Sequence, residues 1–537
     1  MNLSKHLLAC AVAGLAAAPN AVAADLPVKA KAVEYVRICS LYGAGFYYIP
    51  GTDTCLKLNG YMRIDTTFNG SVYNQPAWSG DLGQQNRFRD YFSSRSRLGL
   101  SIDTRTATDY GVVRTFGLAD FQFTTLGFST TNPVFFNTTS PAGFANLLDT
   151  PGGGYVAASL LFIQFAGFTF GKSYSAYATP WQGYPGNNTV YLLGGHDTVT
   201  GVNNIKYTAE FGNGVTGTIG LDDPTVFNRT VVANLNLPIT PTGGLANSYA
   251  GVHAPDIVGN VRVDQAWGLF QISAAAHEVN ASYNILNSSW TGVGAAFFPT
   301  LAPAGATGLA PGQPNAFSET SGHPDSKWGG SVMMALQIKN IPTGAGDDIK
   351  MDVSWAKGNT KNVISTSSTS PFFTMFGGSS IGYQSVGFGA TTDAVWLPTF
   401  NGGDGSLHLT EAWGIRGAFN HNWDAVWSSS FFGSYSAVRY DSVAKTEICT
   451  IYTGFRAAVH SADYSCNPDY NVALLGVVTR WTPFKNFAIS AEVLWFYLDQ
   501  KFTGTAVLTP TAPKPTTTYE YKDQQTVSYN VRVQRNF

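Results

Sequence analysis

Apolar and polar side chains alternate with a period of two along much of this chain. In residues 56–68, and again in residues 527–537, nearly every second side chain is apolar and those between are polar. Strands with this pattern have one face for lipid or a core and one face for water. No segment after residue 24 has the roughly 18 consecutive apolar residues of a membrane-spanning helix. If the protein crosses a membrane, it must therefore do so as a closed β-barrel.

Applied to the whole sequence, the same pattern predicts about sixteen strands. They lie near 56–68, 91–103, 111–124, 155–165, 168–173, 202–211, 214–222, 255–264, 268–279, 328–339, 347–357, 408–420, 425–439, 470–481, 487–500 and 522–537. Short connections, such as Ala166-Gly167, alternate with long ones, such as 125–154 and 358–407. We therefore predict an all-β fold, a transmembrane antiparallel β-barrel with short periplasmic turns and long external loops. We expect the Gly/Ser/Thr/Pro-rich stretches to be surface loops and expect no helix of comparable length.

The composition agrees with a protein that shows apolar surface to lipid. Charged residues make up 12% of the sequence and aromatic residues 14%, and the formal net charge is −2. A typical globular domain has about 25% charged residues. The low charge suits an outer surface that contacts outer-membrane lipid, and nothing in it indicates nucleic-acid binding.

The N-terminus has the features of an export signal. A basic start at Lys5, an apolar stretch in 7–18 and the small residues of 21–23 indicate a cleaved signal peptide in residues 1–24. Cys10 resembles the cysteine of a lipoprotein cleavage box, but it lies too close to Met1 for an apolar segment to precede it. Residues 25–55 are expected to form a small periplasmic or rim segment, and residues 56–537 to form the barrel.

Four cysteines follow the signal peptide and fall into two local pairs, Cys39 with Cys55 and Cys449 with Cys466. An exported protein reaches an oxidising compartment, so we expect each pair to form a disulfide. Closing a loop of this length stabilises a fold by about 3 kcal/mol through its effect on the unfolded chain. Neither pair has the C-x-x-C spacing or the neighbouring histidines of a metal site.

Three parts of the sequence resemble one known family. The block 25–55, which contains Cys39 and Cys55, is similar to the N-terminal block of the alphaproteobacterial porins. Residues 164–172 resemble the hairpin that leads into the constriction loop of that family. The terminal strand ending in Phe537 is similar to the signal read by the outer-membrane assembly machinery, although Arg535 occupies a position that is usually apolar.

The resemblance implies a location and a function. It implies a sixteen-stranded barrel in the bacterial outer membrane, assembled as a homotrimer, with its third external loop folded into the lumen. In this chain that loop would be about Ser173–Gly201. It also implies a water-filled channel for passive diffusion of small hydrophilic solutes and ions. The C-terminal strand would then engage the assembly machinery.

A diffusion channel needs a narrow point and an electric field across it. By strand alternation several basic side chains are expected to face the lumen, and a lysine lies at the mouth of the inserted loop. The loop itself offers one acidic residue. The candidate pore-lining residues are Arg63, Arg95, Arg97, Arg114, Lys172 and Asp197. This set predicts a weak preference for anions, whereas on a soluble protein the same arginines would form a solvated strand face.

No catalytic or cofactor-binding motif is present in the sequence. The eight histidines are scattered, and none belongs to an H-E-x-x-H motif or to a pair at metal-ligand spacing. His277 and Glu278 are neighbours on a predicted strand, so they point to opposite faces. We therefore predict no enzymatic activity, no cofactor and no metal. A substrate-specific channel with an aromatic path, and a secreted soluble β-rich binding protein, remain as alternatives.

Overall fold

A computed structural model describes residues 37–70, 83–87, 89, 91–124, 153–187, 192–196, 200–225, 230–236, 239, 245, 247–285, 318–364, 372–510 and 512–537. The predicted signal peptide 1–24 and the first part of the predicted segment 25–55 lie outside these residues. Within them, no helix combines the length and the apolar character needed to cross a membrane.

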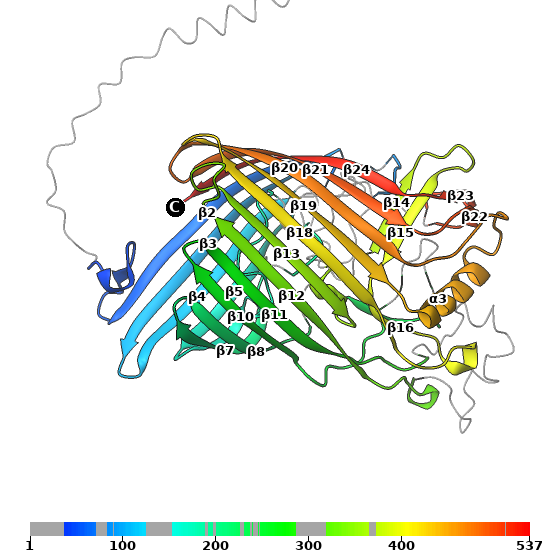
Figure 1. Cartoon of the computed structure of the whole chain (residues 1–537), viewed down its shortest axis with the longest axis horizontal. Coiled ribbons are helices and arrows are strands. Elements are labelled where there is room, and N and C mark those ends of the chain that lie inside the picture. The colour runs from blue at the N-terminus through cyan, green and yellow to red at the C-terminus, as the bar shows by residue number, and fades with distance from the viewer. Residues whose placement is uncertain are drawn as a thin grey trace, which may run out of the picture.

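Sixteen antiparallel strands of the described residues form one closed barrel (Figure 1). They are β2 (Thr54–Phe68), β3 (Phe92–Thr108), β4 (Gly111–Thr124), β5 (Gly153–Phe165), β6 (Phe168–Ser173), β7 (Val202–Gly212), β8 (Val215–Asp222), β10 (Asp256–Gln265), β11 (Gly268–Val279), β12 (Lys327–Lys339), β13 (Asp348–Lys357), β18 (Glu411–Asn422), β19 (Trp427–Arg439), β20 (Tyr470–Phe484), β21 (Phe487–Gln500) and β24 (Gln524–Asn536). The barrel closes where β24 pairs with β2. At that seam the backbone of Phe537 donates to the carbonyl oxygen of Gly60 at 2.9 Å.

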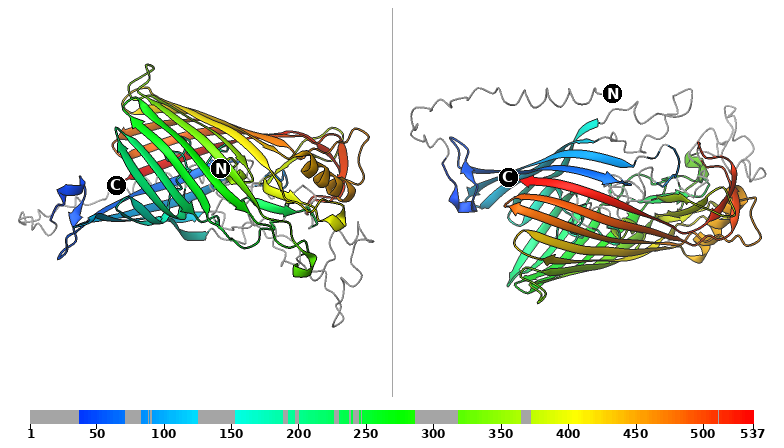
Figure 2. Two further views of the ribbon diagram at one scale, coloured as in Figure 1. Left: turned by 60° about the horizontal axis from the view of Figure 1, so that its bottom comes forward. Right: turned by 90° about the horizontal axis from the view of Figure 1, so that it is seen from above.

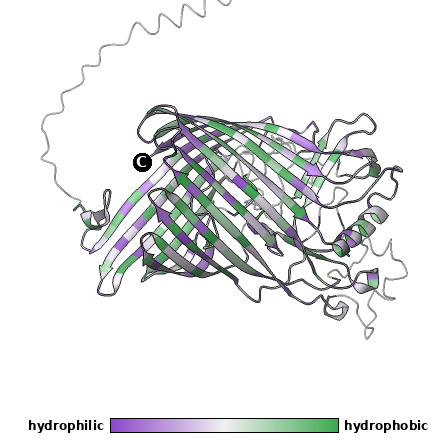
Figure 3. Ribbon diagram, in the orientation of Figure 1, coloured by the Kyte–Doolittle hydropathy of each residue, from purple (hydrophilic) through white to green (hydrophobic). Residues whose placement is uncertain are grey.

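The predicted alternation of faces is present on the barrel wall (Figure 3). On β2, Ile64 is 51% exposed on the outer face, whereas its neighbour Asp65 is fully buried on the inner face. Closure of the sheet satisfies the backbone N–H and C=O groups of the wall, as a hydrocarbon environment requires. All sixteen predicted strands correspond to barrel strands, with boundaries that differ by a few residues.

The short connections are tight turns built for positive φ angles. Ala166 and Gly167 adopt φ of 49° and 83° between β5 and β6, and Asn213 and Gly214 adopt 49° and 73° between β7 and β8. Two successive positive φ angles match the right-handed twist of the strands that such a turn connects. A Cβ at Gly167 would also lie 3.0 Å from the carbonyl oxygen of Thr208. Glycine is therefore required there for space as well as for conformation.

The long connections contain more structure than predicted, and this corrects two expectations. A four-stranded sheet contains β14 (Phe372–Gly377), β15 (Ser385–Ala390), β22 (Thr505–Leu508) and β23 (Thr517–Tyr521), and a three-stranded sheet contains β9 (Val231–Asn234), β16 (Thr392–Trp396) and β17 (His408–Leu409). Among the described residues, the helical segments are α3 (Ser442–Phe455) and the 3-10 turns η1 (Ser40–Tyr42), η4 (Ser318–Ser321), η5 (Thr360–Asn362) and η6 (Thr399–Asn401). A short strand β1 (Tyr47–Tyr48) pairs with β2. The sheets and α3 gather at the barrel end opposite the C-terminus and β1 (Figure 2).

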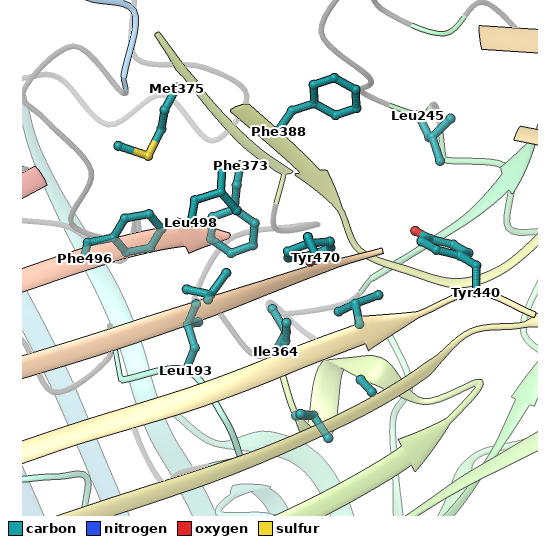
Figure 4. Close-up of a cluster of buried hydrophobic side chains, with 14 of the residues drawn as sticks. Leu193, Leu245, Ile364, Phe373, Met375, Phe388, Tyr440, Tyr470, Phe496 and Leu498 are labelled. Carbon is teal, nitrogen blue, oxygen red and sulfur yellow. The ribbon is translucent and has the colours of Figure 1, made fainter. Parts of the chain in front are cut away.

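The hairpin β14–β15 lies against the inside of the barrel wall rather than on the surface (Figure 4). The ring of Phe373 lies 5.6 Å from the ring of Tyr470 and 5.9 Å from that of Phe496. On β20, Leu474 is buried beneath this hairpin while the adjacent Leu475 is 61% exposed on the outer face. Both faces of β20 and β21 are therefore apolar at this end, because protein covers the inner face. Burial of each large apolar side chain contributes about 1.5–3 kcal/mol.

The helix α3 contradicts the expectation that no long helix occurs. Asp441 caps its N-terminus, since the Asp441 side chain accepts a hydrogen bond from the backbone of Ala444 at 2.8 Å. Ala444, Ile448, Ile451 and Tyr452 are buried on one face, and their spacing is helical. This short amphipathic pattern was missed because it stands alone among segments with a period of two.

Both predicted disulfides are present. Cys39–Cys55 links the segment before the barrel to β2, with a Cα–Cα distance of 6.0 Å. Cys449–Cys466 links α3 to the segment that enters β20, with a Cα–Cα distance of 5.7 Å. The first bridge therefore fixes the N-terminal segment to the wall, and the second fixes the helix to the end of the barrel.

Candidate pore constriction

The described parts of the connection between β6 and β7, residues 174–187, 192–196 and 200–201 of the predicted loop Ser173–Gly201, lie inside the barrel. Its first part lies on the inner face of two strands. The side chain of Asn260 on β10 donates to the carbonyl oxygen of Ala176 at 2.6 Å. That of Gln271 on β11 donates to the carbonyl oxygen of Ala178 at 2.8 Å. These bonds satisfy backbone groups of the loop that would otherwise be buried without partners.

A buried ion pair holds the middle of the loop to the wall. Arg416 on β18 and Asp352 on β13 face inward, with Arg416 Nε 3.0 Å from Asp352 Oδ1. From the loop, Tyr184 donates its hydroxyl to Asp352 Oδ1 at 2.5 Å. Arg416 in turn donates to the carbonyl oxygens of Leu192 at 3.3 Å and His196 at 3.2 Å. One guanidinium thus connects two wall strands to two points of the loop.

The tip of the loop reaches the far wall at β20, β21 and β24. Asn187 donates from its side-chain amide to Asn530 Oδ1 at 2.9 Å and accepts from Ser490 Oγ at 2.8 Å. Its backbone N–H donates to the carboxylate of Glu492. Arg480 donates to the carbonyl oxygen of Pro185. The loop therefore crosses the lumen from β6 to the opposite strands and narrows it between these attachments.

A row of polar side chains, four of them charged, runs across the inner wall from the point where the loop tip is attached. Arg480, Ser490, Arg532, Asp65 and Arg95 are directly paired neighbours across five adjacent strands. Arg95 Nη2 lies 2.7 Å from Asp65 Oδ2, and Arg532 forms a second ion pair with the same carboxylate. The row is therefore a connected strip of the inner wall at the level of the loop tip.

Comparison with known proteins decides the family. A family model described as the Porin subfamily matches residues 25–530. The chain belongs to this porin family. Porin Omp2b of Brucella abortus (strain 2308) is 30% identical over 273 residues, which are 50% of this chain and 64% of that protein. Porin Omp2b of Brucella suis is 29% identical over 277 residues, again 50% of this chain and 64% of the relative. The matched part thus spans less than two thirds of these relatives, and the resemblance to alphaproteobacterial porins is confirmed.

A solved structure supports the fold. The outer membrane channel DcaP of Acinetobacter baumannii superposes with a TM-score of 0.53 and 12% identity, covering 91% of this porin and 99% of that chain. Membership of the porin family and the closed β-barrel place this porin in the bacterial outer membrane. Family membership also indicates a channel protein and not an enzyme.

Three of the sequence-predicted arginines lie in or beside the charged row of the porin. Arg95 is buried against Asp65. Arg97 donates to Gln122 Oε1 at 2.7 Å and lies 3.8 Å from a carboxylate oxygen of Asp120. Arg63, the strand partner of Arg97, donates to Gln534 Oε1 at 3.0 Å. These contacts hold the guanidinium groups in place on the inner face of β2 and β3.

The other three candidates have different positions. Arg114 faces the lumen, and its strand partner is Arg105 on β3. Arg105 is eight residues from Arg97 along β3, so Arg114 lies about 26 Å from Arg97 in the direction of the short turns. Arg114 binds Asp103 at 3.0 Å. The prediction for Lys172 is wrong, because its strand partner Leu161 is exposed on the outer face of the barrel. The strand turns Ser173 inward instead. Asp197 lies outside the described residues.

Sequence reasoning missed several charges at this level of the porin. We define the arginine wall as Arg63, Arg95, Arg97, Arg480 and Arg532 together with the carboxylates Asp65, Asp120 and Glu492. Asp65 and Arg532 occupy inward-facing positions in the alternating pattern of their strands, so the sequence pattern alone would have placed them inside the barrel. Their contact could not be found in that way, since they are 467 residues apart and meet only because the barrel closes. The five guanidinium groups and three carboxylates leave two positive charges.

The lumen widens between the loop and the short turns. A cavity of about 600 Å³ lies there, bounded by the loop at Tyr174–Pro180 and by the inner faces of β7, β8, β10 and β11. Its charged lining residues are Lys206, Glu210, Arg262 and Asp264. A polar cavity of this size holds many water molecules. It is the vestibule behind the loop on the side of the short turns.

Proposed function

We propose that this chain forms a water-filled channel in the outer membrane for passive diffusion of small hydrophilic solutes and ions. The observation that carries the proposal is the loop Ser173–Gly201, which is bonded to the inner wall on both sides of the lumen. The polar vestibule on one side of it also supports the proposal. A channel with a fixed internal loop selects solutes mainly by size and charge.

We further propose that the arginine wall gives the channel a weak preference for anions. A guanidinium stays charged at every relevant pH, so a surplus of two positive charges makes a steady field at the loop. Asp65 offsets one of the two positive charges of Arg95 and Arg532, which both pair with it, so one surplus charge remains at this buried group. Asp120, 3.8 Å from Arg97, offsets one of the charges of Arg63 and Arg97, so the second surplus charge lies at this less buried pair. Asp197 would oppose it if its side chain faces the same space.

The test is recording in planar bilayers under a salt gradient. We expect a stable ohmic conductance and a reversal potential of the sign that marks anion preference. Replacing Arg63→Ser and Arg97→Ser together should shift the potential towards cations. Arg535→Ser is the control, because Arg535 bonds the carbonyl oxygen of Lys485 near a short turn, away from the wall. A purified, folded protein without conductance would refute the channel. An unchanged potential in the double variant would refute only the role of the arginines.

The same recordings separate a general channel from a substrate-specific one. Solute blockage that saturates at low concentration for one sugar or amino acid, and not for others of similar size, would favour the specific channel. The soluble binding protein is set aside by the family and the barrel.

We also propose that the protein is a homotrimer, as the family resemblance implies. Native mass determination of the detergent-extracted protein should give three copies, and a monomer would contradict this. We propose that residues 1–24 are cleaved on export, which N-terminal sequencing of the mature protein tests. Recognition of the strand ending in Phe537 is tested by Phe537→Ala, which should lower the amount of barrel assembled in the membrane.

A further inference from the structure

Three ligand-type side chains converge at the barrel end that carries α3, outside the pore. Asp404 follows η6, His408 begins β17, and Glu447 lies in the second turn of α3. One carboxylate oxygen or imidazole nitrogen of each lies within 4.8 Å of those of the others. Asp404 is exposed, His408 is half-buried and Glu447 is buried. Side chains from two separate connections of the barrel thus meet at one point.

The buried carboxylate of Glu447 is the part of this cluster that is hardest to explain without a bound ligand. Its side chain is only 5% exposed. Oε1 accepts a hydrogen bond from the backbone N–H of Asp404 at 3.3 Å, whereas Oε2 is buried with no hydrogen-bond partner among the described residues. A buried carboxylate oxygen without a partner is costly and calls for an explanation, and an unseen ion is one of the common ones. Burial raises the pKa of Glu447 to about 7, although the backbone N–H groups of Asp404 and, more weakly, Leu397 lower it in part.

His408 is oriented as histidine ligands usually are. Its Nδ1 lies 3.0 Å from Asp441 Oδ2, and its Nε2 lies 3.1 Å from Asp404 Oδ2. Metal-binding histidines almost always donate their second ring N–H to a carboxylate, which fixes the tautomer and the ring plane. Asp441 is itself held, because its other oxygen caps α3. With the proton on Nδ1, the lone pair of Nε2 faces Asp404.

We propose that Asp404, His408 and Glu447 bind one divalent first-row transition ion, with Zn²⁺ as the probe, and that Asp441 orients His408. One imidazole and two carboxylates form a nitrogen and oxygen donor set, which favours zinc and its neighbours over Ca²⁺ and Mg²⁺. In a tetrahedral zinc site with bonds of about 2.0–2.2 Å, the ligand atoms lie roughly 3.3–3.6 Å apart. The ligand atoms of this cluster all lie within 4.8 Å of one another, so the widest separation must shorten when the ion binds. The exposed Asp404 is the ligand that can move. The bound ion would tie the segment before β17 to α3.

The competing explanation is a protonated His408 that bridges Asp404 and Asp441 with no metal. Burial lowers the pKa of His408, but the bonds to these two carboxylates outweigh it and raise the pKa overall. Lys327 is a further cation that acts on this cluster; it donates to the carbonyl oxygen of Leu407 at 2.7 Å and contributes to lowering the pKa of Asp404. This explanation accounts for His408 and leaves Oε2 of Glu447 without a partner. The two explanations differ in whether zinc binds.

The experiment uses the full-length mature protein, extracted in detergent, stripped with a chelator and dialysed at pH 7.5. Calorimetric titration with ZnCl₂, with metal content measured after desalting, should give one ion per chain. His408→Asn and Glu447→Gln should each weaken binding by at least tenfold, and Asp441→Asn less. His253→Asn is the matched control, because His253 is 65% exposed and lies 3.7 Å from one carboxylate, Glu278, with no third ligand. It should leave zinc binding unchanged.

Other results would overturn the proposal. Wild-type protein that takes up no zinc at 1 mM, or binds it equally well in both ligand variants, excludes this site; binding of Ca²⁺ in place of Zn²⁺ excludes the class of ion. Should Glu447→Gln fail to assemble, His408→Asn and Asp404→Asn still decide, since both side chains lie at the solvent boundary. Bilayer conductance is independent of these outcomes.

Discussion

Replacing Arg416 tests the idea that one buried ion pair holds the constriction loop in place. The variant Arg416→Met keeps most of the volume and removes the guanidinium. Asp352, fully buried, would then keep only the hydroxyl of Tyr184 among the bonds described above, and the carbonyl oxygens of Leu192 and His196 would lose their donor. We expect the loop, rather than the barrel strands, to yield.

The size of the effect follows from burial. Breaking a buried pair by removing one partner costs about 3–5 kcal/mol, because the remaining charge is uncompensated. Since each 1.4 kcal/mol is about tenfold in an equilibrium constant, the opening equilibrium of the loop should rise by roughly two to three and a half orders of magnitude. When the loop opens and closes faster than its open amides exchange, the exchange rates are proportional to the opening equilibrium constant and rise by the same factor.

Hydrogen exchange followed by mass spectrometry measures this directly. Peptides that contain Tyr184 should lose protection by about 100- to 4,000-fold, while peptides of β2 and β24 should not change. Arg439→Met is the control, since Arg439 is partly buried on the neighbouring strand β19 and bonds Asn471 and backbone carbonyls without an ion pair. The double variant Arg416→Met with Asp352→Leu leaves no buried charge and should exchange more slowly than the single one. If the double variant exchanges as fast as the single variant or faster, the uncompensated charge is not the cause.

Three further predictions address other parts of the molecule. Replacing Cys449→Ser and Cys466→Ser should cost about 3 kcal/mol locally, seen as faster proteolysis within α3 under conditions that leave the barrel intact; equal cleavage rates would contradict it. With a chelator present, raising the pH from 5 to 8 should speed amide exchange in α3 beyond its intrinsic pH dependence. The pKa values of Glu447 and His408 are both raised in the folded protein. Their contributions to stability are therefore present at low pH and lost as the pH rises. Glu447→Gln should reduce that change, and an unaltered profile would count against it. Tyr184→Phe should weaken loop attachment by about 1.5–3 kcal/mol, measured by the same exchange experiment.

Much of the barrel could be predicted because lipid and water impose the period of two on every strand. The turn at Ala166-Gly167 was predicted because its geometry is local, whereas the turn at Asn213-Gly214 lies one residue beyond the Gly212-Asn213 that the sequence indicated. The inner hairpin was not predicted, because its burial depends on contacts such as that of Phe373 with Phe496, which the barrel wall brings together from distant segments. The alternation of side chains along the strands correctly placed Arg63, Arg95 and Arg97 on the inner face. It was not applied to Lys172, although Phe168 and Phe170 lie on the outer face and the same alternation puts Lys172 there too.

The same limit applies to the charges. Counting lumen-facing arginines in the sequence gives their number but not their partners, and Asp65 neutralises one of the two charges of Arg95 and Arg532. Asp65 is fully buried, and its pairs hold the strands β24, β2 and β3 together at the barrel seam. Beyond about 8–10 Å in physiological salt, exposed charges are screened, so a passing ion responds to the local surplus and not to the total. Arg95 and Arg532 are only 5% and 8% exposed, whereas Arg63 and Arg97 are less deeply buried. We therefore expect selectivity in this porin to depend more on Arg63 and Arg97, and Arg95 and Arg532 mainly to stabilise the barrel seam.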